Sequence, residues 1–218
     1  MLATRERFSD LCRRIGARDN PVTGRTVDGT YNDLIVAYTS FDRHYHDITH
    51  LEEGLKLIDT PEIRRSAENP DWLEMAWWWH DETYETRDAK TKLNELTSAA
   101  KAFETLRDLS VPDKVCVEIL IGIMPTLHTY VPTEHDHKLI ADIDLVRLAA
   151  PWPDFEKNSE NRRLEDDVTV EESKIRRVQF FYNFMKNRKY VFLTEHFRVR
   201  YEKQARENIR MVLDTANV

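Results

Sequence analysis

Cysteine is scarce in this chain. Only Cys12 and Cys116 occur among 218 residues, and neither belongs to a Cys-x-x-Cys pair or to a Cys-His cluster. A disulfide scaffold and a zinc finger both need more thiols at closer spacing, so the sequence excludes both. A domain of this length buries roughly 70% of the surface that its unfolded chain exposes, so its core needs no such cross-links.

Glycine is also scarce, with five residues in the whole chain. β-Sandwiches and dinucleotide-binding folds need many glycines in turns and phosphate loops, so the low count favours helices. Long apolar runs are missing as well, because the longest, 75–79 and 115–124, are far shorter than the roughly 20 residues that span a bilayer. Residues 1–20 lack the apolar stretch of a secretory signal. We therefore expect an all-α protein of the cytoplasm with no membrane segment.

The chain also lacks a surplus of basic residues. The chain has 32 basic and 39 acidic residues and a net charge of -7. This balance argues against an extended nucleic-acid-binding surface, although a local basic pocket is still allowed.

Signals for helix starts recur along the chain. A capping residue precedes proline at Thr60-Pro61 and Asn69-Pro70, and Thr169 with Glu172 forms a capping-box pattern. With apolar residues at helical spacing, these signals predict helices over 4–15, 31–40, 46–58, 61–67, 70–85, 88–108, 112–128, 135–148, 170–187 and 195–213. Residues 149–168, rich in proline and asparagine, are expected to form a connecting loop. The prediction is one domain: a helix and polar turns in 1–30, a metal-binding core in 31–148, and a loop and helices in 149–218.

Histidines and carboxylates supply the candidate chemistry. His80-Asp81 follows the apolar run 75–79, so we expect it on a core-facing helix, where two ionisable side chains are costly unless they are paired or bound to a cation. His46 and His50 are four residues apart, so on a helix they share a face, and both could bind a metal or only one. The run Met75–Trp79 itself, with its three tryptophans, is expected to be core rather than a base-stacking platform.

Two further carboxylates, Asp142 and Asp144, lie inside an apolar helical pattern, and either could be a ligand. The combined set of imidazole and carboxylate groups suits a divalent ion such as Mn, Mg, Fe, Zn, Co or Ni, in one or two copies.

The order of these residues resembles a known signature. His50, then His80-Asp81, then Asp144 is similar to the H…HD…D pattern of the HD-domain metal-dependent phosphohydrolases. Tyr45-His46-x-x-x-His50 also resembles a motif of cyclic-nucleotide phosphodiesterases, which share the HD architecture. A closer likeness is to predicted HD phosphohydrolases of about 200 residues, and it extends over residues 31–212. Two positions depart from the pattern: Asp47 stands where asparagine is expected, and Ile143 where alanine is common.

The resemblance implies an HD-type helical bundle and a role for each site residue. His50, His80, Asp81 and Asp144 would hold the metal, with Asp142 as the alternative to Asp144, while Asp81 would also be essential for catalysis. His46 would be the general acid, with Asp47 beside it adding negative charge that favours its protonated form. Arg43 and Lys92 would meet phosphate, and Glu95 would orient ligands or substrate. His128 would be a candidate ligand of a second ion.

The function implied is hydrolysis of a small phosphorylated substrate, such as a nucleotide, by a protein that can form a homo-oligomer. Two alternatives stay open: a di-iron oxygenase, and a helical binding module in which the metal is only structural.

Overall fold

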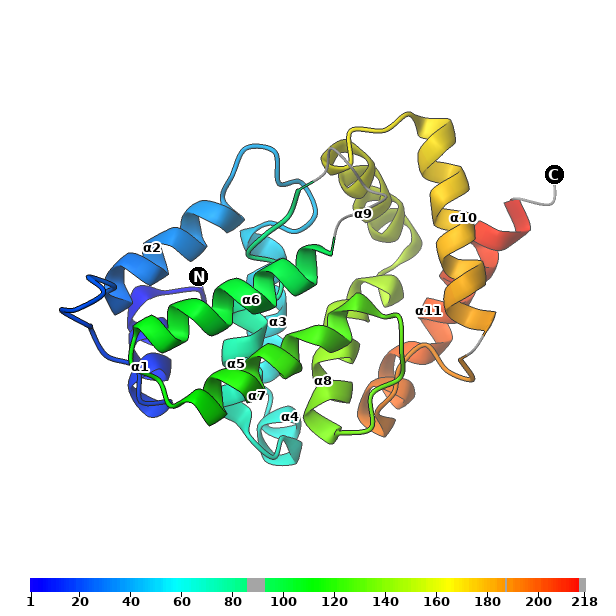
Figure 1. Cartoon of the computed structure of the whole chain (residues 1–218). Coiled ribbons are helices and arrows are strands. Elements are labelled where there is room, and N and C mark those ends of the chain that lie inside the picture. The colour runs from blue at the N-terminus through cyan, green and yellow to red at the C-terminus, as the bar shows by residue number, and fades with distance from the viewer. Residues whose placement is uncertain (86–92, 187, 216–218) are drawn as a thin grey trace.

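A computed structural model describes residues 1–85, 93–186 and 188–215 of the chain. These residues form an all-helical single domain without strands, which confirms the predicted fold class (Figure 1). In chain order the helices are α1 (Arg5–Arg14), α2 (Val27–Tyr38), α3 (Ile48–Ile58), α4 (Pro61–Ser66), α5 (Pro70–Trp79), α6 (Asn94–Asp108), α7 (Asp113–Ile123), α8 (His135–Asp144), α9 (Trp152–Glu165), α10 (Val170–Lys186) and α11 (Glu195–Thr215). Two short 3₁₀ helices, η1 (Met124–Leu127) and η2 (Leu145–Ala149), follow α7 and α8.

Several helix starts lie where the sequence places them. Pro61 and Pro70 open α4 and α5 at the first helical position, where the missing N–H costs nothing. The hydroxyl of Thr169 accepts a hydrogen bond from the amide of Glu172 at 3.2 Å at the start of α10. Local sequence chemistry is therefore enough to begin these helices.

The segment 149–168 is a correction. We expected a loop, but α9 occupies Trp152–Glu165, with Pro153 in its first turn. The asparagines that suggested a loop, Asn158 and Asn161, are partly buried in this helix, while Phe155 and Glu165 are buried. Proline at the start of a helix favours it, so the two prolines mark a helix start and not an irregular stretch.

The core is built around α5. Trp77, Trp78 and Trp79 are 0%, 0% and 3% exposed, which confirms that the tryptophan run is core. Helices α1, α3, α7 and α8 pack against α5. Gly54 lets α3 approach closely, because a Cβ there would lie 2.0 Å from the Trp77 ring. Trp77 donates from its indole N–H to the carbonyl of Leu51 at 2.9 Å, which fixes the two helices beside each other.

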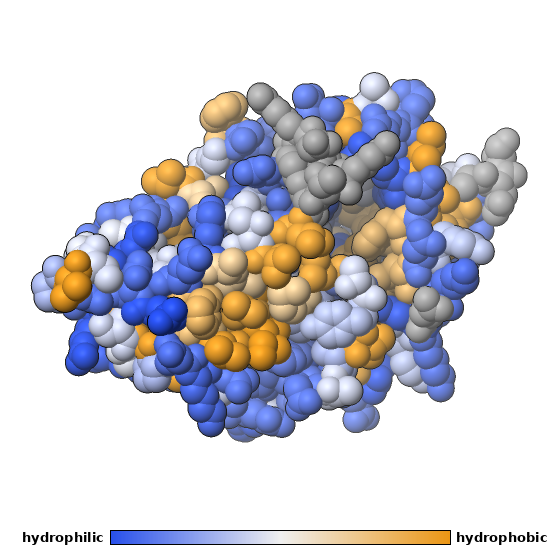
Figure 2. Space-filling model, in the orientation of Figure 1, coloured by the Kyte–Doolittle hydropathy of each residue, from blue (hydrophilic) through white to orange (hydrophobic). Residues whose placement is uncertain are grey.

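On the face shown in Figure 2, a group of apolar side chains lies over the central helices α6 and α7, with hydrophilic side chains around it. Leu96, Val117 and Ile121 are among the exposed apolar residues of these helices. Among the described residues, no helix is long and apolar enough to cross a membrane.

Candidate metal centre

Four predicted ligands meet at one point. His50 comes from the first turn of α3, His80 and Asp81 from the end of α5, and Asp144 from the end of α8. Each offers one ligand atom, and these atoms all lie within 4.8 Å of one another. Residues up to 94 positions apart in the chain therefore form one cluster, in which three side chains are buried and Asp144 is partly exposed.

The helix ends, rather than helix faces, present these groups. We expected His80 and Asp81 inside a helix over 70–85, but α5 ends at Trp79 and His80 is its C-cap. His46 likewise lies before α3, because the side chain of Asp47 caps that helix by accepting from the amides of Thr49 and His50 at 3.0 Å. Asp47, which stands where the resemblance expects asparagine, is therefore the N-cap of α3.

The donor atoms face each other as ligands of a common cation would. Nε2 of His50 lies 3.2 Å from Nε2 of His80 and 3.2 Å from Oδ1 of Asp144, and Nε2 of His80 lies 3.0 Å from Oδ2 of Asp81. A cation about 2.1 Å from each donor holds neighbouring donors roughly 3 to 4 Å apart. The Oδ2 atom of Asp81 is also buried without a hydrogen-bond partner. The residues present therefore fit a divalent metal ion.

The imidazole of His80 is held in the orientation that ligation needs. Its Nδ1 lies 2.7 Å from the carbonyl oxygen of Trp77, which can only accept, so Nδ1 carries the proton. The ring also stacks on Trp77, with the ring centroids 3.9 Å apart. Nε2 is thereby left with a lone pair directed into the cluster, which is the form that binds metal.

Electrostatics keeps the carboxylates charged. Burial alone would raise the pKa of Asp81, but the neighbouring His80 and His46 hold it well below its ordinary value. Hydrogen bonds from His128 and His50 similarly outweigh burial and lower the pKa of Asp144. Burial lowers the pKa of His50 and favours its neutral form, whereas Asp81 raises the pKa of His80 against the effect of burial. The site is thus an anionic one that attracts a cation.

Asp142 does not join the cluster. Its carboxylate is fully buried and accepts from the amides of Leu193 and Thr194 at 2.6 and 2.7 Å and from the Thr194 hydroxyl at 2.7 Å. Two residues along a helix turn the side chain by about 200°, so Asp142 and Asp144 face opposite sides of α8. The structure therefore assigns the open choice between them to Asp144.

Arg43 is also placed elsewhere than expected. Its guanidinium donates to the backbone carbonyls of His46, Asp81 and Glu82 at 2.8 to 2.9 Å. These bonds tie the segment before α3 to the turn after α5, and they occupy three of the five N–H donors of the guanidinium. Arg43 thus holds together the two backbone segments that carry His46 and Asp81. Lys92, the second predicted phosphate contact, lies outside the described residues.

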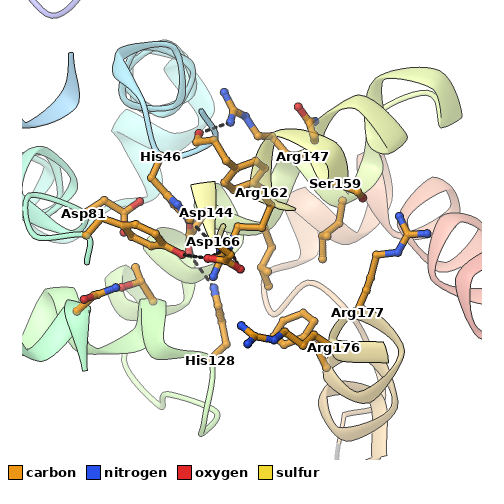
Figure 3. A pocket seen from close by; sticks show the side chains of 18 of the residues that line it. His46, Asp81, His128, Asp144, Arg147, Ser159, Arg162, Asp166, Arg176 and Arg177 are labelled. Atoms are coloured by element: carbon orange, nitrogen blue, oxygen red, sulfur yellow. Dashed lines mark hydrogen bonds and ion pairs between the residues drawn. The ribbon is translucent and has the colours of Figure 1, made fainter. Parts of the chain in front are cut away.

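The cluster lies at one end of a pocket of about 440 Å³. Figure 3 shows His46, Asp81, His128 and Asp144 on one side, Arg176, Arg177 and Ser159 on the other, and Arg162 with Asp166 between them. Helices α9 and α10 supply the far wall, including Phe155, Phe180 and Phe181. Glu95, from the first turn of α6, also lines the pocket. Burial raises the pKa of Glu95, and the nearby Asp81 and Asp144 add to this shift.

His46 lines the pocket outside the four-ligand cluster. Its Nδ1 lies 2.6 Å from Oε2 of Glu165, and its Nε2 lies 3.2 Å from a guanidinium nitrogen of Arg162. The ring stacks on Tyr84, with centroids 4.1 Å apart. One edge of the imidazole is therefore anchored in the protein and the other faces the pocket.

His128 approaches the site through Asp144. Its Nε2 lies 2.8 Å from Oδ2 of Asp144, the oxygen that does not face His50. Its Nδ1 is buried without a hydrogen-bond partner. In the described part of the chain, His128 is not a member of the four-ligand group.

The sequence did not predict the residues of α9 and α10 that line the pocket opposite the metal cluster. Arg162 and Glu165, which contact His46, lie in the segment that we expected to be a loop, and so their i, i+3 spacing on one helix face went unused. Arg176 and Arg177 lie on a predicted helix whose pocket-facing side only the tertiary structure reveals.

Comparisons with known proteins identify no relative. No family model matches the chain, and neither the curated proteins nor the solved structures contain a match.

Proposed function

We propose that this protein is a metal-dependent phosphohydrolase that cleaves a phosphoester bond of a small phosphorylated substrate such as a nucleotide. One observation carries the proposal: a buried group of two imidazoles and two carboxylates opens onto a pocket whose other wall bears guanidinium groups. A bound cation and guanidinium groups on opposite sides of one cavity suit an oxyanion placed between them. The order of the four ligands in the chain, which resembles the HD signature, agrees with this reading.

His50, His80, Asp81 and Asp144 would hold the ion. When bound, such an ion polarises phosphoryl oxygens and lowers the pKa of bound water toward about 7. The imidazole and carboxylate set accepts Mn, Mg, Fe, Zn, Co or Ni, with no thiolate that would select a softer metal.

Arg162 is the side chain best placed to meet the phosphoryl group. It reaches Nε2 of His46 with one nitrogen, and its Nε lies 3.2 Å from Oδ2 of Asp166. A planar guanidinium has five N–H donors, so it can exchange these partners for the oxygens of a phosphate. These contacts support Arg162 on α9 as the proposed phosphate contact in place of Arg43.

His46 would transfer the proton. Its Nε2 faces the pocket and would take the proton that the attacking water loses, once Arg162 turns toward the substrate, and the Glu165 carboxylate would stabilise the resulting imidazolium. The same Nε2 then protonates the leaving oxygen. Glu95, from α6, lines the same pocket and is a candidate to contact the substrate.

The test is metal analysis of the wild type and Asp81→Ala, followed by turnover of a generic phosphodiester and a nucleotide panel with added manganese. Asp81 contributes one of four ligands, so its loss should weaken metal binding by more than the roughly 10–100-fold that loss of an outer-shell partner costs. Phosphate release should fall to background in the variant, while its circular dichroism stays helical.

Asp113→Ala is a matched control, because Asp113 is an exposed carboxylate at the start of α7, outside the pocket. It should keep both metal and turnover. Retained hydrolysis in Asp81→Ala contradicts the proposal. So does a wild type that binds no metal, or one that holds two irons and consumes oxygen without hydrolysis.

A further inference from the structure

Glu165 is a buried carboxylate that lies beside the proposed proton-transfer group. It is the last residue of α9, it is 3% exposed, and both of its oxygens are engaged by the segment before α3. Oε1 accepts from the amides of His44, Tyr45 and His46 at 3.3, 3.4 and 3.1 Å. Oε2 lies 2.6 Å from Nδ1 of His46.

The partners of His46 determine where its ring proton lies. The hydrogen bond from His46 outweighs burial and lowers the pKa of Glu165, so Glu165 is a carboxylate that can only accept. The guanidinium of Arg162 can only donate. Between these two groups, the neutral imidazole must carry its proton on Nδ1 and its lone pair on Nε2.

We propose that Glu165 is a positioning residue that fixes His46 as the Nδ1–H tautomer, with the Nε2 lone pair directed into the pocket. The consequence for turnover rests on the proposed function, whereas the tautomer itself does not. Glu165 does more than bind the backbone of the segment before α3. Its Oε1 alone accepts from all three amides, so its Oε2 is left to accept from the His46 ring. Tyr84, stacked on the ring face, restricts its remaining rotation.

Helix α9 holds both nitrogens of the ring. Arg162 and Glu165 are three residues apart and so lie on one face of that helix. The packing of α9 against the segment before α3 therefore orients His46, the proposed proton-transfer group. The same packing positions Arg162, the proposed phosphate contact. A displacement of α9 would disturb both together.

Glu165→Gln tests the proposal with the least change in shape. The Gln carbonyl oxygen can still accept from the three amides, while its NH₂ group faces Nδ1 of His46 and can only donate. The ring should therefore switch to the Nε2–H tautomer. We expect kcat to fall by roughly 10²–10⁴-fold, the usual contribution of general acid–base catalysis, with KM changed by less than about threefold.

The decisive readout is the tautomer, measured by two-bond ¹⁵N–¹H correlation of histidine side chains in the zinc-loaded protein, with His46→Asn identifying the signal. Glu160→Gln is the matched control, since Glu160 lies on the same helix, is exposed and pairs with Arg163. It should leave the tautomer, the metal content and the rates unchanged. Glu165→Asp should keep the Nδ1–H tautomer and recover part of kcat.

Two results would overturn the proposal: an Nε2–H signal in the wild type, or a Glu165→Gln variant that keeps the Nδ1–H signal and the wild-type kcat. If Glu165→Gln does not fold, the wild-type signal and the Glu165→Asp variant still decide. A wild type with the expected tautomer but without metal-dependent hydrolysis refutes the proposed function and leaves the role of Glu165 intact.

Discussion

The two faces of α8 carry the same side chain in opposite roles. Asp142 faces the start of α11 and is surrounded by three protein donors, all within 2.7 Å. Asp144 faces the pocket, is 16% exposed, and lies among imidazole nitrogens. The hydrogen bonds of Asp142 all come from the polypeptide itself. Asp144 instead lies in a cluster of ligand atoms that could hold a cation.

This difference shows that burial alone does not identify a functional carboxylate. The more deeply buried of the two is the structural one, because its hydrogen bonds come from a fixed helix start. What distinguishes a ligand is convergence with other ligand atoms from separate elements, as at His50, His80 and Asp81.

The largest expected effect separates the two faces by metal binding. Asp144→Asn keeps the shape of the side chain but removes a charged ligand, so metal affinity should fall by well over the roughly 10–100-fold typical of outer-shell changes. Isothermal titration with manganese and zinc measures the affinity, and elemental analysis the stoichiometry. Asp142→Asn should bind metal like the wild type, and an equal loss in both variants would remove the distinction.

The next effect separates the faces by stability. Asp142→Asn places an NH₂ group against donors of Leu193 and Thr194, so it should lower the free energy of unfolding by about 1–3 kcal/mol at pH 4. For a chain of this size, this corresponds to roughly 2–4 °C in Tm for each kcal/mol. Thermal unfolding in EDTA measures it without contribution from metal. Unchanged stability would show that the hydrogen bonds at the start of α11 matter little.

The third effect is the pH dependence of that stability difference. Burial raises the pKa of Asp142 to about 6, against an ordinary value near 4, so the folded state binds this proton more tightly than the unfolded state. Stability from this group is complete below pH 4 and is lost as the pH rises through about 6. The destabilisation caused by Asp142→Asn should therefore shrink between pH 4 and pH 7, by up to about 3 kcal/mol.

Unfolding of the wild type and Asp142→Asn in EDTA across this range isolates the effect, since the histidines titrate in both proteins and cancel in the difference. A destabilisation that stays constant from pH 4 to pH 7 would contradict the raised pKa.

Local chemistry explains which features could be predicted from the sequence. Pro61 and Pro70 favour a helix start through their own backbone geometry, whatever the rest of the fold. The apolar run 75–79 is stable only when it is buried in the core. His50, His80-Asp81 and the pair Asp142 and Asp144 were recognisable because their order resembles the HD signature and because ionisable groups in apolar helical patterns need a partner. The loop predicted at 149–168 is wrong because prolines and asparagines also occur in helices: Pro153 lies in the first turn of α9, and Asn158 and Asn161 lie within it.

The sequence by itself determined the helical class, the helix starts at Pro61 and Pro70, and His50, His80 and Asp81 with one of two aspartates as candidate ligands, because these follow from side-chain chemistry, near-neighbour spacing and the resemblance of their order to the HD signature. Only the tertiary structure decided which aspartate faces the cluster, that Arg43 binds backbone carbonyls, and that Glu165 and Arg162 enclose His46. Those facts depend on how α8, α9 and the segment before α3 pack. Contacts between residues more than 100 positions apart are set by that packing and leave no mark in local sequence.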